Sequence, residues 1–103
     1  MKTTTAISAL ALLLTVSPLA SAQGLYPGMR LAHEAKVTLL QAKAIALRTV
    51  PGKIVSQELE RERGGSGLRY TFDIKAGLQT REVGVDAKSG RVLENVVEGK
   101  NRD

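Results

Sequence analysis

The chain has 103 residues, no cysteine, one histidine and a formal net charge of +5. This length allows one small domain, and the lack of cysteine excludes disulfide bonds. Basic and acidic residues alternate and only Tyr26, Tyr70 and Phe72 are aromatic, so the basic stripe with stacking aromatics that nucleic-acid binding needs is missing.

The first 22 residues predict a secretory signal peptide. Lys2 supplies the positive start, residues 6–16 an apolar run, and Ala20-Ser21-Ala22 a small-residue cleavage site. An uncleaved anchor is disfavoured, because a run this short spans far less than the roughly 30 Å of a bilayer core. We therefore expect a periplasmic or secreted protein that begins at Gln23 and has no membrane span after cleavage.

The mature chain has to be stable without covalent cross-links. Removing residues 1–22 leaves 81 residues, with 14 Lys and Arg against 10 Asp and Glu because Lys2 is lost. Packing alone or self-association must then stabilise the fold, which leaves a homodimer open.

Residues 23–37 are expected to form a partly ordered lead-in segment, in which residues 31–36 could add a helical turn. This segment contains His33-Glu34-Ala35-Lys36-Val37, which begins like the His-Glu-x-x-His motif of zinc peptidases. The fifth position is Val37, and the chain has no second histidine. His33 is therefore predicted to be a surface residue and not a metal ligand.

A helix is predicted from Leu39 to about Val50. Thr38 suits the N-cap and Gln41 the third helical position, as in a capping box. Pro51-Gly52 should end the helix. The apolar stripe that should face a sheet consists of Leu39, Ala42, Ala46 and Val50, with Ile45 beside it.

The apolar period then changes to two, which is typical of strands. Short, glycine-containing links join the segments, so they should form an antiparallel meander. The resulting α+β domain is placed at residues 38–97, with a flexible polar tail at 98–103. The predicted strands are residues 54–62, 68–75, 80–86 and 91–97.

One face of this sheet is predicted to pack on the helix and the other to stay open. The packed face should carry Leu68, Tyr70, Phe72 and Ile74, continued by Val83 and Val85 and by Val55 and Leu59. The open face should be charged, with cross-strand pairs of opposite sign. Its members are Glu58, Glu60, Arg69, Asp73 and Glu82.

No motif in the chain predicts catalysis, a cofactor or a metal site. The paired carboxylates Glu58 and Glu60 lie on an open face and not in the cleft that a glycosidase needs. Residues 64–67 are glycine-rich but precede a strand, so they predict a turn and not a phosphate loop. Asp86 and Gly90 predict a structural turn, with Asp86 bonding the backbone and Gly90 taking a positive φ.

Taken in order, these residues resemble the PepSY domain over about residues 36–97. The resemblance implies a helix on an antiparallel sheet and a role in restraining peptidases or in sensing at the cell envelope; it implies no peptidase activity and carries over no binding residues. It rests on Val37-Thr38-Leu39, Gln41-Ala42, Ala46, Pro51-Gly52-Lys53-Ile54-Val55, Glu58-Leu59-Glu60, Tyr70-Thr71-Phe72-Asp73-Ile74, Val85-Asp86-Ala87 and Gly90-Arg91-Val92-Leu93.

Two functions follow as hypotheses. The first is an exported, non-catalytic module that binds a partner protein, a peptidase or an envelope sensor, through the open face or an edge strand. The alternative is a periplasmic module that binds a small ligand or a cation.

Overall fold

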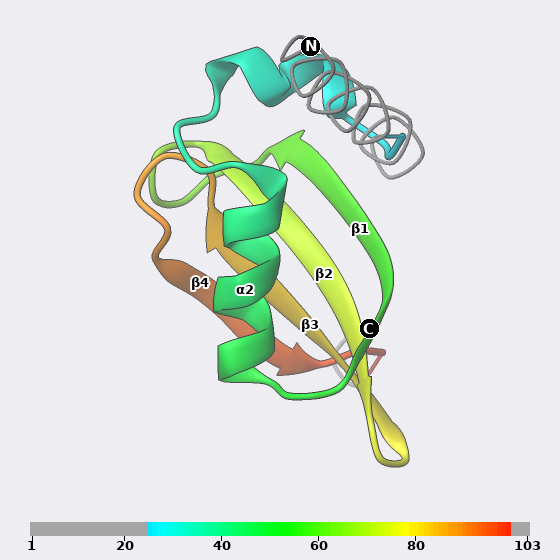
Figure 1. Ribbon diagram of the computed structural model, residues 1–103. Coiled ribbons are helices and arrows are strands. Elements are labelled where there is room, and N and C mark those ends of the chain that lie inside the picture. Colours follow the sequence, from blue (N-terminus) through cyan, green and yellow to red (C-terminus); the bar gives the residue numbers. More distant parts are fainter. Residues whose placement is uncertain (1–24, 100–103) are drawn as a thin grey trace, which may run out of the picture.

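The computed structural model describes residues 25–99 as one helix lying across a four-stranded sheet (Figure 1). The proposed signal peptide and the end of the expected tail lie outside these residues. The predicted α+β class is confirmed. In chain order the elements are the 3₁₀ helix η1 (Met29–Glu34), the α-helix α2 (Leu39–Thr49) and the strands β1 (Lys53–Arg61), β2 (Leu68–Ala76), β3 (Gln79–Asp86) and β4 (Val92–Val97).

The predicted capping box starts α2. The Thr38 hydroxyl accepts a hydrogen bond from the backbone N–H of Gln41 at 3.1 Å, and the Gln41 side chain accepts one from the N–H of Thr38 at 2.9 Å. Two N–H groups that the helix itself leaves unpaired are thus bonded. The helix ends at Thr49, just before the proline that cannot continue it.

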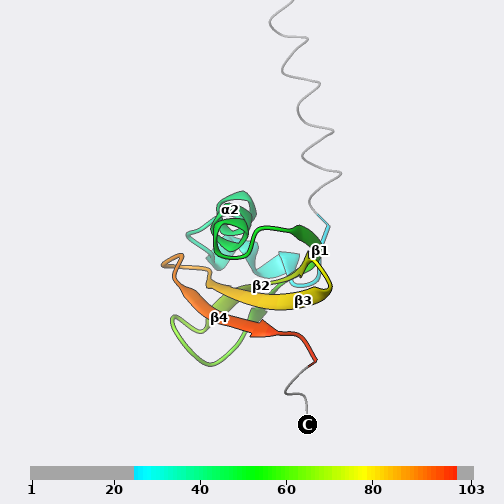
Figure 2. The same ribbon diagram turned by 90° about the horizontal axis from the view of Figure 1, so that it is seen from below.

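The four strands lie in the order β1-β2-β3-β4 and all pair antiparallel, as the short links predicted. The tightest link joins β2 to β3, where Ala76 pairs with Gln79 and only Gly77 and Leu78 lie between them. Gly77 has a φ of 67°, which suits the first central position of such a turn. Figure 2 shows α2 on one side of the sheet and the β1–β2 loop on the other.

The core lies between α2 and the sheet. Tyr70, Phe72 and Ile74 of β2 are buried there, as predicted, and the rings of Tyr70 and Phe72 lie 6.3 Å apart. The Tyr70 hydroxyl donates to the carbonyl of Val37 at 2.8 Å, which satisfies its polar end. Burial, with a smaller contribution from Tyr26, raises the pKa of Tyr70 to about 12.

The prediction that Val55 faces the helix is wrong. A β-bulge interrupts the register between Ile54 and Ser56, so Ile54 pairs with Ile74 and Val55 is the extra residue. Val55 is 52% exposed, whereas Ile54 packs against the core in its place. Leu59, the other residue predicted for this face of β1, is buried.

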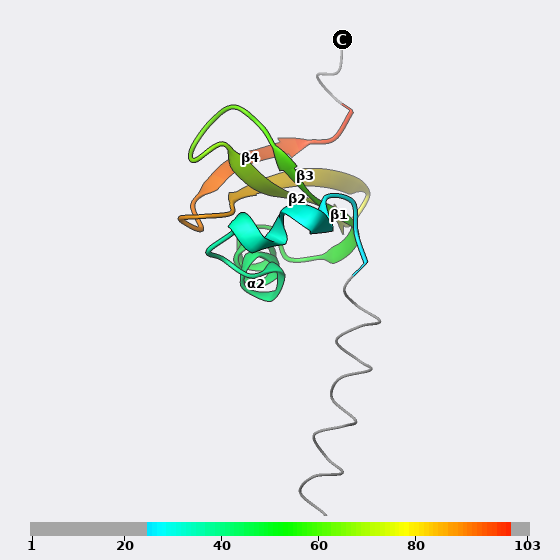
Figure 3. The same cartoon turned by 90° about the horizontal axis from the view of Figure 1, so that it is seen from above.

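The lead-in segment packs against the sheet at β1 (Figure 3). Pro27 accepts a hydrogen bond from the backbone N–H of Leu59 at 2.9 Å, and Leu31 of η1 is buried in the core. Glu34, the last residue of η1, forms an ion pair with Arg61 at 2.6 Å. The helical turn expected within residues 31–36 therefore begins two residues earlier and covers part of the edge of β1.

Within residues 25–99, no helix combines the length and apolar character needed to cross a membrane.

Candidate functional site

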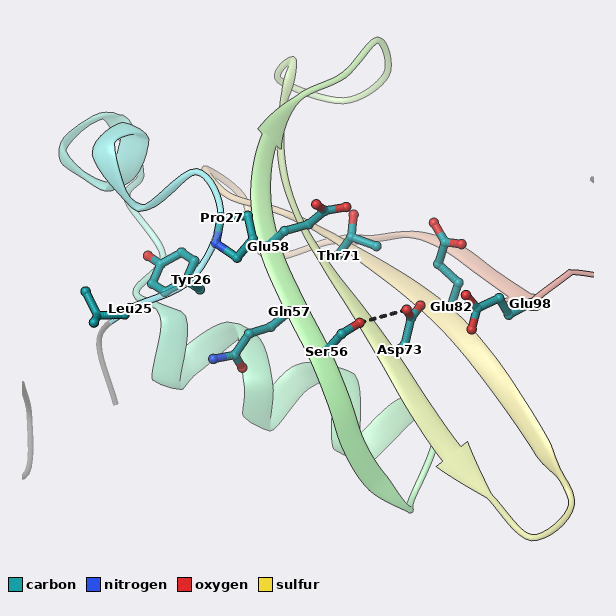
Figure 4. Close-up of a pocket in the computed structure, with 10 residues that line it drawn as sticks. All are labelled: Leu25, Tyr26, Pro27, Ser56, Gln57, Glu58, Thr71, Asp73, Glu82 and Glu98. Carbon is teal, nitrogen blue, oxygen red and sulfur yellow. Dashed lines mark hydrogen bonds between the residues drawn. The ribbon is translucent and has the colours of Figure 1, made fainter. Parts of the chain in front are cut away.

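A groove of about 610 Å³ runs from the edge of β1 onto the outer face of the sheet, the face opposite α2 (Figure 4). One wall comes from the lead-in segment and the floor from β1 and β2. The opposite side comes from β3 and the residue after β4. The lining residues are Leu25, Tyr26, Pro27, Ser56, Gln57, Glu58, Thr71, Asp73, Glu82 and Glu98.

Strand alternation places the acidic residues of the groove on one face. Thr71 and Asp73 project outward from β2 because Tyr70, Phe72 and Ile74 point into the core. The register then puts Glu58 beside Thr71 and Glu82 beside Asp73. The part of the groove on the outer face is consequently acidic, in a chain whose net charge is positive.

Asp73 and Glu82 are cross-strand neighbours of like charge, so the opposite-sign pairing expected on this face does not hold at this position, whereas Glu60 and Arg69, of opposite sign, are paired in the register. Asp73 instead accepts a hydrogen bond from the Ser56 hydroxyl at 2.7 Å. The bulge at Val55 allows this hydrogen bond, because the register shift places Ser56 on the outer face opposite Asp73.

Glu60 continues the acidic row beyond the groove. Burial, a hydrogen bond shared with Glu62 and the charges of Glu58 and Glu62 together raise the pKa of Glu60 to about 6. The sequence predicted that Glu60 lies on an open face, whereas the structure buries it in part. Burial and the neighbouring carboxylates Glu58 and Glu62 therefore disfavour the charged form of Glu60.

Arg69 lies on the outer face, but the prediction that it is exposed there is wrong. Its residue is only 7% exposed, because the β1–β2 loop folds over it. The guanidinium lies 3.3 Å from Glu94 and 3.8 Å from Glu62, and it donates to the carbonyl of Arg63. Arg69 and the β1–β2 loop therefore cover one end of the outer face, and the groove lies toward the other end.

The remaining predicted features take the structural roles expected of them. His33 has a side chain that is 76% exposed, and its Nδ1 bonds the carbonyl of Arg30 at the surface. Residues 64–67 form the β1–β2 turn. Asp86 accepts hydrogen bonds from the backbone N–H groups of Ser66 and Lys88 and from the Ser66 hydroxyl. Gly90 has a φ of 82°.

No group of three or more His, Asp or Glu side chains in the described part of the chain is arranged to hold a metal ion. The polar groups that the groove offers are carboxylates, hydroxyls and one amide, beside the exposed apolar side chain of Leu25. Such a surface suits a cationic ligand that also has an apolar part.

Sequence reasoning missed the wall formed by residues 25–27. These residues lie about 30 positions before β1 in the chain, and no periodicity marks them. Glu98 was assigned to the polar tail, although it continues the alternation of Glu94 and Val96 on β4. That alternation was a signal that could have included it.

A family model described as "Peptidase propeptide and YPEB domain", or PepSY, matches residues 36–95. The match covers more than half of the chain and spans α2 and nearly all of the sheet, with the groove floor inside it. Neither the curated proteins nor the solved structures give a match. The residues from which the sequence predicted the helix cap and the strands lie within the matched segment. The chain therefore belongs to the PepSY family.

Proposed function

We propose that this protein is an exported, non-catalytic PepSY module that binds a partner protein and restrains or regulates it. The observation that carries the proposal is the acidic groove on the outer face, which α2 leaves uncovered. The family description, which refers to peptidase propeptides, supports a peptidase as partner, and an envelope sensor is the other candidate.

The division of the sheet into two faces supports a binding role. The face toward α2 is filled by core side chains, so it stabilises the fold. The acidic side chains of the outer face do not contribute to that core, and Asp73 and Glu82 lie side by side with like charge. A partner with a basic surface would be steered toward the carboxylates that line the groove.

Photo-crosslinking in intact cells tests the partner. A photoreactive residue in place of Ser56, which is exposed in the groove, should capture a peptidase or a sensor protein. The same residue in place of Lys88, an exposed position in the β3–β4 turn, is the control and should not. Capture from both positions alike would argue against the groove.

Regulation is tested with the captured partner. Adding the purified protein should lower the partner's peptidase activity or change its signalling output, and Asp73→Lys with Glu82→Lys should weaken that effect about tenfold or more. His33→Ala should leave it unchanged, because His33 lies outside the groove. An undiminished effect in the lysine variant would overturn the proposed site.

Export is the remaining part of the proposal, and the N-terminal pattern of Lys2, the apolar run and Ala20-Ser21-Ala22 supports it. The protein recovered from the periplasm or medium should begin at Gln23. N-terminal sequencing measures this. Recovery only from the cytoplasm with Met1 or Lys2 retained would contradict export.

A further inference from the structure

A cleft of about 380 Å³ lies on the helix side of the domain, between α2 and the turn that joins β3 to β4. Figures 1 and 2 show this turn, in orange, beside α2. Hydrogen bonds hold the turn there, because the backbone N–H groups of Lys36 and Val37 both donate to the carbonyl of Ala87 at 2.9 Å. The cleft shares no described residue with the groove of the outer face, so it is a distinct site.

The floor of the cleft is apolar. It consists of Val37, Ala44 and Ile45, of which Val37 and Ile45 also pack against the core. Gly90 closes the cleft from the side of the turn: a Cβ at that position would lie 3.3 Å from Cδ1 of Ile45 and 3.8 Å from Cγ2 of Val37. The floor therefore offers room for one apolar side chain of a ligand.

Two exposed polar side chains on the rim of the cleft have donors to offer. The Oε1 atom of Gln41 accepts the N–H of Thr38 in the capping box, so the Nε2 group of Gln41 is left to donate to a ligand. The Arg48 guanidinium forms no hydrogen bond or ion pair with any residue between 25 and 99. Gln41 and Arg48 lie about 10 Å apart along the helix axis, so one small anion cannot contact both.

Basic side chains also border the other end of the cleft, near the start of α2. Lys36 lies in the loop before the helix, and Lys88 and Arg91 flank the turn residues that line the cleft; all three are exposed. In the described part of the chain none of the three forms an ion pair. The pKa of Glu34 is lowered mainly by its hydrogen bond from Arg61 and less by the charge of Lys88, so Glu34 does not neutralise Lys88. No described carboxylate lines the cleft, and its surroundings are positively charged.

The spacing of these groups favours an extended peptide over a small anion. An extended chain rises about 3.3 Å per residue, so roughly three residues cover the distance from Gln41 to Arg48. Side chains at alternate positions point the same way, so an apolar residue and an acidic residue two positions later can reach the floor and Arg48 together. An acidic residue two positions before the apolar one comes close to the basic end that contains Lys36 and Lys88. The cleft thus matches the pattern Asp/Glu-x-apolar-x-Asp/Glu.

Other acidic surfaces fit the cleft less well. In a second copy of this chain, Asp73 and Glu82 lie on the two central strands, which pair on both sides and cannot enter the cleft as a single extended segment. Repeated contacts of that head-to-tail kind would form rings or filaments. A flat membrane surface would contact the exposed lysines but leave the apolar floor empty. A flexible acidic segment matches both the charge and the shape of the cleft.

We propose that the cleft between α2 and the β3–β4 turn binds an extended acidic segment of a partner protein. One apolar side chain of the segment occupies the floor, a backbone carbonyl accepts a hydrogen bond from Nε2 of Gln41, and a carboxylate pairs with the guanidinium of Arg48. This binding deepens the proposed function and rests on it for the identity of the partner, whereas binding at the cleft is a property of this chain and does not involve the groove.

Synthetic peptides and NMR test the cleft on the purified protein. A blocked peptide with the core Glu-Thr-Leu-Thr-Glu should bind and shift the side-chain amide signal of Gln41 and the backbone amide signals of Ser89 and Gly90, but not that of Ser56 in the groove. Lys in place of both Glu, or Gly in place of Leu, should weaken binding about tenfold or more. Equal binding of the Glu and Lys peptides, or shifts confined to the groove, would overturn the proposal.

Charge reversal at Arg48 separates the cleft from diffuse attraction. Arg48→Glu should weaken peptide binding about tenfold or more, and Arg48→Lys should weaken it less, because lysine keeps the charge but not the paired hydrogen bonds. Arg30→Glu, the same charge change at an exposed residue of η1 outside the cleft, is the matched control and should change binding less than about twofold. Equal binding losses in Arg48→Glu and Arg30→Glu would overturn the proposal.

Ala44→Glu tests the floor of the cleft independently. It places a carboxylate where the apolar side chain should lie, and it should weaken peptide binding about tenfold. Ala44 is exposed on α2 and glutamate is a good helix former, so the variant should keep the circular dichroism of the fold. Unchanged binding in both Ala44→Glu and Arg48→Glu would overturn the proposal.

The rival occupants give different results. Tighter binding to phosphatidylglycerol vesicles than to the Glu peptide, weakened by Arg48→Glu, would mean that a membrane surface occupies this side and would overturn the proposal. Self-association in sedimentation that both Arg48→Glu and Asp73→Lys abolish would identify a second copy and would also overturn it. Failure of the Glu peptide with successful capture through Ser56 would reject the cleft and keep the groove. Peptide binding at the cleft without such capture would reject the peptidase or sensor as partner and keep the cleft.

Discussion

Asp86 is the carboxylate on which two turns of this domain depend. It is buried, yet the hydrogen bonds from Ser66 and the backbone N–H groups of Lys88 and Ser66 outweigh burial and hold its pKa at about 2. It therefore ties the β1–β2 loop to the β3–β4 turn. The sequence predicted the bond to its own turn, but the bonds to Ser66 depend on a contact between residues 20 positions apart.

Asp86→Asn should lower the free energy of unfolding by about 2 kcal/mol at neutral pH. Because the folded pKa lies below the ordinary value of 3.8, the charged form stabilises the fold above about pH 4, and this contribution is lost as the pH falls toward 2. Urea unfolding at pH 7 and at pH 2.5 measures the difference. Asp73→Asn, on the outer face, is the control. An equal deficit at both pH values would contradict this account.

Glu60 should affect stability in the opposite sense. Its folded pKa of about 6 exceeds the ordinary value of 4.5, so the folded state loses stability as the pH rises through 6. Glu60→Gln should therefore raise the unfolding free energy by about 1 kcal/mol at pH 7.5, a value reduced for solvent screening, and leave it unchanged below pH 4.5. Urea unfolding at both pH values measures this. Glu58→Gln, which removes only a neighbouring charge, should give a smaller gain.

At the level of the elements, the sequence predicted α2 and all four strands to within a residue or so, because local chemistry fixes their ends. The capping box and Pro51 fix the helix, and glycine turns fix the strands. The sequence could not predict in full which side chains of β1 point toward the core. Ile54 and Val55 are both β-branched, so the pattern allows either to point inward, and only pairing with β2 places the bulge.

The 3₁₀ helix η1 is an element whose docking depends on Gly28. This glycine has a φ of 85°, and a Cβ would meet the backbone of Leu59. Gly28→Ala should displace the lead-in segment, expose Leu31 and lower the unfolding free energy by about 2 kcal/mol or more. Hydrogen exchange at the Leu59 amide should accelerate in parallel, because its bond to Pro27 is lost.

Gly67→Ala is the matched control for that change. Gly67 has a similar φ of 92°, but a Cβ there would meet nothing within 4 Å. It should therefore show the backbone strain alone, about 1 kcal/mol, without faster exchange at Leu59. If both variants behaved alike, steric contact with Leu59 would not be what positions the lead-in segment.

For the molecule as a whole, the two sides of the sheet differ in charge. Acidic side chains gather on the outer face, whereas basic residues surround the helix, in α2, in the loop before it and in the β3–β4 turn. These are Lys36, Lys43, Arg48, Lys88 and Arg91. Composition gives only the net positive charge, so the sequence predicted the open face but not the groove, whose wall comes from residues 25–27.

Residues 25–35 of the lead-in segment precede the family match at residues 36–95, yet they pack as part of the folded unit. A chain that starts at Lys36 should keep α2 and the sheet but lose the buried Leu31 and the bond from Leu59 to Pro27. Its unfolding free energy should be lower by about 2 kcal/mol or more, and the uncovered edge of β1 should promote association. Urea unfolding and size-exclusion chromatography over a concentration series measure both effects against a chain that starts at Gln23. If the shortened chain stayed monomeric with an unchanged unfolding free energy, the lead-in segment would form the groove wall without stabilising the fold.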